Sequence, residues 1–143
     1  MIQLYKALVR PKLQICIQAW RPYLQRDINL LEKVQLSATR LIFAGEVMPY
    51  DDRLKYLHLT TLETRRIRGD LTEVFKITKN LEDTNRDLFF KLSGTGLRGH
   101  SLKLFKPQAR LDIRKYSFSH RVADNWNALP QSLIDCKTLD NSH

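Results

Sequence analysis

The feature that most constrains the fold is the spacing of the apolar residues, which recur every three or four positions in two long stretches. Residues 28–42 form the first stretch, and Asp27 immediately before them suits a helix N-cap. Residues 62–79 form the second, which opens with the capping-box pattern Thr60–Glu63. The expected core faces are Ile28, Leu31, Val34, Ala38, Leu41 and Ile42 in the first stretch, and Ile67, Leu71, Val74, Phe75 and Thr78 in the second. This pattern predicts a mainly α fold, a helical bundle in which each helix buries one face.

Further helices are predicted on either side of these two. Residues 2–20 have a helical pattern, but Pro11 predicts a kink or break because proline lacks a backbone donor and clashes with the preceding turn. Short helices are expected at residues 50–57 and 85–91. A last helix is expected with Phe118, Val122 and Trp126 as its anchors.

The spacing of the apolar residues changes near the C-terminus. Residues 93–99 hold three of the five glycines and predict a loop. After the loop, Leu102 and Leu104 alternate with Ser101, Lys103 and Phe105. Apolar and polar residues alternate again in 110–114, and Pro107 lies between the two runs. This alternation predicts a small antiparallel β-hairpin. We therefore expect a helical region, 1–92, and a C-terminal region of hairpin plus helix, 93–143, packed as one unit.

The charge balance narrows the class of partner. The 143 residues include 24 Lys and Arg against 15 Asp and Glu, a formal net charge of +9. Nucleic acid, or an anionic membrane surface, is then the first partner class to consider. Because no apolar run reaches the length of a bilayer span, we expect no membrane partner. The N-terminus also lacks a secretion-signal pattern, so we expect a nuclear or cytoplasmic protein that is not secreted.

Two groups of basic residues are the candidate nucleic-acid-binding residues. At about 100° per residue, one stripe of the helix from Leu62 carries basic residues and no acid. Its members, expected to make the main contact, are Arg65, Arg68, Lys76 and Lys79. Arg66 falls elsewhere on the helix, where Asp70 and Glu73 offset its charge. Residues 98–121 hold seven basic residues and one acid. The members expected to bind there are Lys103, Lys106, Arg110, Arg114 and Lys115. An ordinary solvated face is the alternative for both groups.

No catalytic, metal or cofactor site is expected. Tyr50, Asp51 and Asp52 are similar to the paired aspartates of reverse transcriptases, but the spacer residue and the flanking apolar strands are missing. Two-metal chemistry also needs a further aspartate, for which the sequence offers no candidate. The pair is better explained as acids at a helix N-terminus. The rival hypothesis, an enzyme that uses this pair, requires metal-dependent polymerase activity from the isolated chain.

Two other motifs are weak. Cys16 and Cys136 lie in no Cys/His cluster, so they predict no zinc site and favour a reducing compartment. The integrin-type tripeptide Arg68-Gly69-Asp70 falls in the middle of a predicted helix, where chance is the simpler explanation.

A series of short motifs runs through nearly the whole chain in a fixed order. They are Leu4–Pro11, Trp20–Tyr23, Asp27–Ile42, Arg53–Leu57, Leu62–Arg66, Arg68–Leu71, Glu73–Lys76, Arg98–Leu104, Ser119–Val122 and Trp126–Pro130. Taken together, they resemble the region just after the polymerase palm in LINE-type (non-LTR) retrotransposon reverse transcriptases, nearest the jockey-like group. The ordered set, rather than any one motif, carries the resemblance.

The resemblance implies that residues 1–92 are thumb-like and hold an RNA or DNA duplex with low sequence specificity. The fingers, the palm and the catalytic aspartates of an RNA-directed DNA polymerase are missing, so it implies no catalytic residue here. We expect a fragment, because the chain starts within a helical pattern and stops without a cap. Its first helix would normally follow a palm, so Leu4, Leu8 and Ile15 are expected to drive self-association. The alternatives are a helical protein-interaction scaffold and a non-functional retroelement remnant.

Overall fold

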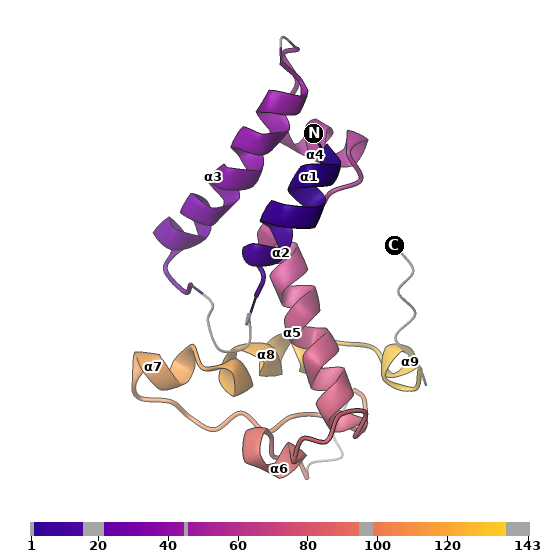
Figure 1. The fold of residues 1–143 in the computed structure, drawn as a ribbon. Coiled ribbons are helices and arrows are strands. Elements are labelled where there is room, and N and C mark those ends of the chain that lie inside the picture. The colour runs from indigo at the N-terminus through magenta and orange to yellow at the C-terminus, as the bar shows by residue number, and fades with distance from the viewer. Residues whose placement is uncertain (1, 16–21, 45, 95–98, 137–143) are drawn as a thin grey trace. The chain divides into compact units, whose positions relative to one another are not determined.

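The chain is mainly helical, as predicted (Figure 1). The computed structural model describes residues 2–15, 22–44, 46–94 and 99–136. It forms two compact units, Met1–Arg68 and Gly69–His143. Their boundary falls inside helix α5, Leu62–Thr78, whereas the boundary predicted after residue 92 lies within the second unit.

The first unit opens with three short helical pieces. They are α1 (Ile2–Leu4), a π-helix (Tyr5–Val9) and α2 (Arg10–Lys12). The wide π turn is closed by the Arg10 amide, which donates to the Tyr5 carbonyl five residues back. Pro11 follows at once and has no amide to donate, and α2 ends one residue later, close to the predicted break.

Helices α3 (Gln25–Ile42) and α4 (Tyr50–Tyr56) complete this unit together with the start of α5. The predicted helices match both, but α3 buries a different face from the one expected. Gln35 and Thr39 are fully buried, whereas Val34 and Leu41 of the predicted apolar stripe are exposed. A polar stripe can be buried only if its hydrogen bonds are made inside the protein.

Gln35 makes these bonds at the centre of the first unit. Its carboxamide oxygen accepts from the Tyr5 hydroxyl at 3.0 Å, and its nitrogen donates to the Tyr50 hydroxyl at 3.1 Å and the Thr60 carbonyl at 3.0 Å. The Tyr50 hydroxyl in turn donates to Glu32. Burial raises the pKa of Tyr5 to about 12, and burial with the Glu32 contact raises the pKa of Tyr50 as well. Both phenols are therefore held in their neutral form.

Helix α5 begins at Leu62, as predicted, but its cap is Thr61 and not the Thr60 of the predicted capping box. The Thr61 hydroxyl accepts from the Thr64 amide at 3.2 Å. A second cap comes from far along the chain, since the Leu62 amide donates to the Glu32 carboxylate at 3.0 Å. The Glu32 carboxylate thus belongs to the Gln35 hydrogen-bond network and also caps the N-terminus of α5, where its negative charge is favourable.

The second unit surrounds an apolar core. It contains the rest of α5, α6 (Arg86–Phe89), α7 (Asp112–Lys115), α8 (Phe118–Asn127) and α9 (Gln131–Ile134). The core residues are Val74, Phe75, Ile77, Phe90, Leu104, Val122, Ala123, Trp126 and Ile134. Val74, Phe75, Val122 and Trp126 had been predicted from periodicity alone, so the core faces of α5 and α8 are confirmed.

The predicted β-hairpin is wrong for the residues described. Leu104 forms a single antiparallel bridge with Leu92, not with the run 110–114, and no strand is present in the described ranges. Most of that second run instead enters α7, whose Arg114 and Lys115 amides both bond back to the Leu111 carbonyl. Alternation over five residues is too short to exclude one helical turn, and the partner of Leu104 in the bridge, Leu92, precedes both alternating runs in the sequence.

Two segments of the C-terminal region hold each other. The Trp126 indole donates to the Leu102 carbonyl at 2.7 Å, and His100 bonds the Trp126 carbonyl at 2.9 Å. The Asn127 side chain accepts from the Leu104 amide at 2.8 Å and donates to the Leu104 carbonyl at 2.9 Å. These residues belong to two of the motifs that carry the family resemblance, and the contacts give them a shared structural role.

Candidate nucleic-acid interface

The two predicted arginines of the α5 stripe belong to the first unit. Arg65 and Arg68 are both exposed. The Arg65 side chain donates to the Gln14 side chain at 2.7 Å, which fixes its direction. Burial lowers the pKa of the nearby Arg10, and the positive charge of Arg65 lowers it further. Arg10 is buried, so of these three arginines Arg65 and Arg68 are the ones accessible to a partner.

The two predicted lysines of the stripe lie in the second unit and are partly engaged. Lys76 pairs with Glu82 at 2.8 Å, which raises the pKa of Lys76. Glu73 lies beside Glu82, and burial together with that neighbouring charge raises the pKa of Glu73. Lys79 lies 5.7 Å from the ring centre of Phe75. Helix α5 has no acid on this stripe, but Glu82, which lies beyond the end of the helix, offsets the charge of Lys76.

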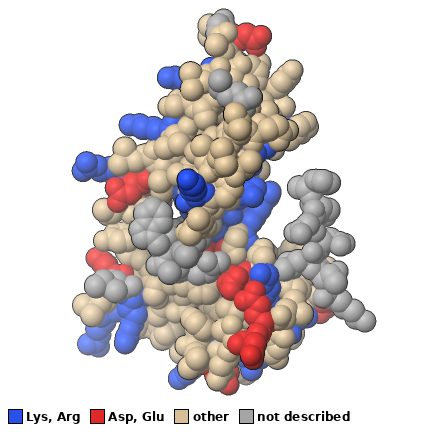
Figure 2. Space-filling view, viewed as in Figure 1, with Lys and Arg blue, Asp and Glu red and all other residues tan. Residues whose placement is uncertain are grey.

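The C-terminal group is the more accessible of the two. Arg110, Arg114 and Lys115 are exposed at and just before α7. In the part of the chain that the structure describes, neither arginine forms an ion pair, and Lys115 lies 5.5 Å from the ring centre of Tyr116. Figure 2 shows basic side chains at the edge where α7 lies in Figure 1. The acid between them, Asp112, sits in the first turn of α7.

Lys103 and Lys106 differ from the other members of this group. Lys103 is half-buried and lies across Gly99, whose φ of 115° favours glycine and where an added Cβ would come within 2.4 Å of the lysine Cε. Lys106 forms an exposed ion pair with Asp124. Exposed ion pairs of this kind contribute little to stability.

One functional-looking arginine has a structural role that sequence reasoning missed. Arg121 donates two hydrogen bonds to Asp70, at 3.0 and 3.1 Å, and both side chains are largely buried. The predicted neighbour of Asp70, Arg66, is itself buried. Asp70 is therefore an internal partner within a helix, which removes the integrin-type interpretation of its tripeptide. The 51-residue separation from Arg121 explains why no local pattern revealed the pair.

Asp51 and Asp52 lie at a helix N-terminus, as predicted. Both are exposed in the first turn of α4, and Asp52 pairs with Lys55 at 3.5 Å. Among the residues described, no group of three potential metal-ligating side chains comes together. Cys136 is exposed, and Cys16 lies outside the described residues.

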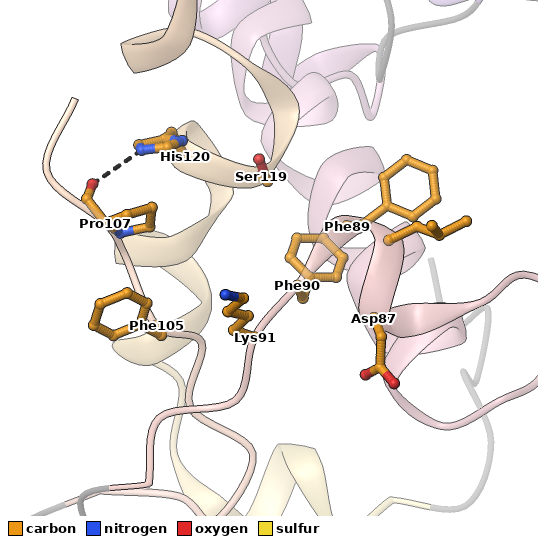
Figure 3. A pocket seen from close by; sticks show the side chains of 9 residues that line it. Asp87, Phe89, Phe90, Lys91, Phe105, Pro107, Ser119 and His120 are labelled. Carbon is orange, nitrogen blue, oxygen red and sulfur yellow. Dashed lines mark hydrogen bonds between the residues drawn. The ribbon is translucent and has the colours of Figure 1, made fainter. Parts of the chain in front are cut away.

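A pocket that the sequence did not reveal lies in the second unit. Its volume is about 220 Å³. The lining residues are Asp87, Leu88, Phe89, Phe90, Lys91, Phe105, Pro107, Ser119 and His120. Figure 3 shows Lys91 pointing toward the space beside Phe105, Pro107 and His120. His120 bonds the Pro107 carbonyl at 3.0 Å, which ties α8 to the opposite wall.

Comparison with protein-family models, with curated proteins and with solved structures found no match. Within the described residues, no helix combines the length and apolar character needed to cross a membrane.

Proposed function

We propose that this chain is a non-catalytic nucleic-acid-binding module of the kind that follows the palm in a non-LTR retrotransposon reverse transcriptase. The observation that carries the proposal is the exposed cationic surface formed by Arg110, Arg114 and Lys115, hereafter the α7 surface. Exposed cations without carboxylate partners are the groups that neutralise phosphates and release counterions.

Two further features support this proposal. The ordered motifs of the chain resemble that family, and the C-terminal ones pack on each other through Trp126 and Asn127. The parent protein would be an RNA-directed DNA polymerase, and this part of it would hold nucleic acid without catalysing the reaction. A nuclear or cytoplasmic location goes with such a function. Because phosphate contacts dominate, we expect low sequence specificity.

The salt dependence of binding tests the proposal. The triple variant Arg110→Gln/Arg114→Gln/Lys115→Gln should flatten the plot of log affinity against log salt. The expected change is about 0.9 units per lost contact on duplex and about 0.7 on single strands. The measurement is fluorescence anisotropy with a labelled duplex and its single strand over a series of salt concentrations.

A control with the same loss of charge separates contact from general attraction. The variant Lys12→Gln/Lys33→Gln/Arg40→Gln removes three exposed cations from the first unit and should change the slope less. A second arm replaces the α5 stripe, Arg65, Arg68, Lys76 and Lys79, by Gln. We expect a smaller effect there than its four charges suggest, because Lys76 already pairs with Glu82. Equal slopes for all three variants would contradict a defined interface.

A second candidate function is a helical protein-interaction scaffold. It is favoured by the exposed apolar side chains of the first helical pieces, including Leu4 and Leu8. A scaffold would bind its partner with little dependence on salt and would bind neither DNA nor RNA. Absence of any binding partner would leave the retroelement remnant as the explanation.

A further inference from the structure

We propose that the pocket of the second unit binds one unpaired nucleobase of a single-stranded nucleic acid, with nearby lysines holding the flanking phosphates. This inference rests on the proposed function and makes it more specific, because it selects a single strand rather than a duplex. The pocket volume of about 220 Å³ is below the range of roughly 300–1,000 Å³ typical of sites for drug-sized ligands. It suits one planar ring system.

The pocket wall offers an aromatic stacking surface. Phe105 is 54% exposed and Phe89 is 45% exposed, although both residues adjoin buried core residues. Every base has a π face, so aromatic rings exposed in this way bind bases without reading sequence. The adjoining Phe90 is buried and forms the floor of the site against the core.

The wall is built before any ligand arrives. The Phe105 amide donates to the Lys91 carbonyl at 2.7 Å, which fixes the segment that carries the ring. On the other side, His120 holds the Pro107 carbonyl. Three separate parts of the chain thus position the site, and a preformed site costs little ordering entropy when it binds.

One lysine lines this pocket, and a second lies next to two lining residues in the chain. Lys91 lines the pocket and is exposed, and Lys106 lies between Phe105 and Pro107. Arg110 follows three residues after Pro107, so its Cα lies within about 11 Å of the Pro107 Cα even if the chain is fully extended. The first cation of the α7 surface, Arg110, therefore lies within that distance of a residue that lines the pocket. Aromatic rings interleaved with cations match a strand of alternating bases and phosphates, whereas an apolar protein side chain would not need the cations.

The pocket also has polar groups at its edge. The Ser119 hydroxyl can donate to a base carbonyl or accept from a base amine. Asp87 lines the other end and pairs with Arg86 at 3.6 Å. Few polar groups around an aromatic wall favour tolerance of any base over selection of one.

The test compares three labelled probes with the full chain: a single strand of ten thymidines, an abasic strand of the same length, and a duplex. The abasic strand keeps the phosphates and lacks the bases. The variant Phe105→Leu keeps an apolar side chain and removes the ring at an exposed position. It should weaken binding of the thymidine strand about tenfold, the lower part of the range for one base stack, while duplex binding is unchanged. Lys91→Gln should reduce the single-strand salt slope by about 0.7.

Tyr56→Leu is the matched control, because Tyr56 is an exposed aromatic residue of the first unit, far along the chain from the pocket. It should leave all three affinities unchanged, and circular dichroism checks that both variants remain folded. If Phe105→Leu leaves the thymidine strand unaffected while the α7 variant still weakens it, the pocket proposal is wrong and the proposed function stands. Equal binding of abasic and thymidine strands by the unaltered chain would likewise overturn it and leave the pocket to an apolar protein side chain. If the chain binds none of the probes, both proposals fail.

Discussion

Removing one side of the Asp70–Arg121 pair should cost far more than removing a surface pair. Asp70 accepts two hydrogen bonds from Arg121, at 3.0 and 3.1 Å, and the two side chains are 3% and 14% exposed. Asp70→Ala therefore leaves a guanidinium with little access to water. Breaking a buried pair in this way costs about 3–5 kcal/mol. For a unit of this size, each 1 kcal/mol lowers Tm by roughly 4–8 °C.

Urea and thermal unfolding followed by circular dichroism measure this loss. Asp124→Ala is the control within the same unit, because its pair with Lys106 has side chains 72% and 40% exposed. That change should cost about 0–1 kcal/mol. The double variant Asp70→Leu/Arg121→Met removes both charges and should recover most of the stability. If Asp70→Ala were no more costly than Asp124→Ala, the pair would not stabilise the second unit as we describe.

Three further predictions concern other parts of the molecule. The chain should self-associate through its first helical pieces, because Leu4 and Leu8 are about 60% exposed. The variant Leu4→Ser/Leu8→Ser should then shift sedimentation toward the monomer. If the unaltered chain is a monomer at every concentration, this prediction is wrong. Primer extension with Mg²⁺ should yield no product, and activity lost in Asp51→Asn/Asp52→Asn would restore the enzyme hypothesis. The pKa of Tyr5 rises from 10.0 to about 12 on folding. The contribution of Tyr5 to the free energy of unfolding should therefore be fully present below pH 10 and be lost between pH 10 and 12, which lowers that free energy by roughly 2–3 kcal/mol. Tyr5→Phe should make that fall smaller in urea titrations at several pH values, and Tyr50, whose pKa is also raised, should account for the remainder. An unchanged pH dependence would refute the assignment.

Long helices were predictable because their signal is local. The repeat in residues 62–79 identified α5 and the buried Val74 and Phe75, and the anchors Val122 and Trp126 identified α8. Periodicity works here because one face of each helix meets an apolar core.

The first unit shows where that reasoning stops. Helix α3 was found, but its buried face is polar, because Gln35 is matched by Tyr5, Tyr50 and Thr60 from elsewhere in the chain. A pattern of apolar residues cannot reveal a face whose burial depends on distant hydrogen-bond partners.

The sequence identified the basic residues of the candidate interface but not how accessible each of them is. Every basic residue proposed from the sequence lies in the described part of the chain, yet their accessibility differs. Glu82 offsets Lys76, Asp124 offsets Lys106, and Arg110 stays exposed. Which cation meets which acid depends on tertiary contacts, as does the pocket, whose walls come from segments separated by up to 33 positions, from Asp87 to His120.

The carboxamide of Asn127 has a consequence for the behaviour of the protein in concentrated solution. Leu104 pairs with Leu92 through neighbouring backbone groups, so its own amide and carbonyl face the opposite side, where a further strand could add. Asn127 occupies both groups. Open backbone edges are templates for intermolecular β-pairing and aggregation. A single side chain thus caps the backbone edge at Leu104, and Asn127→Ala would expose an aggregation site there as well as weaken the fold.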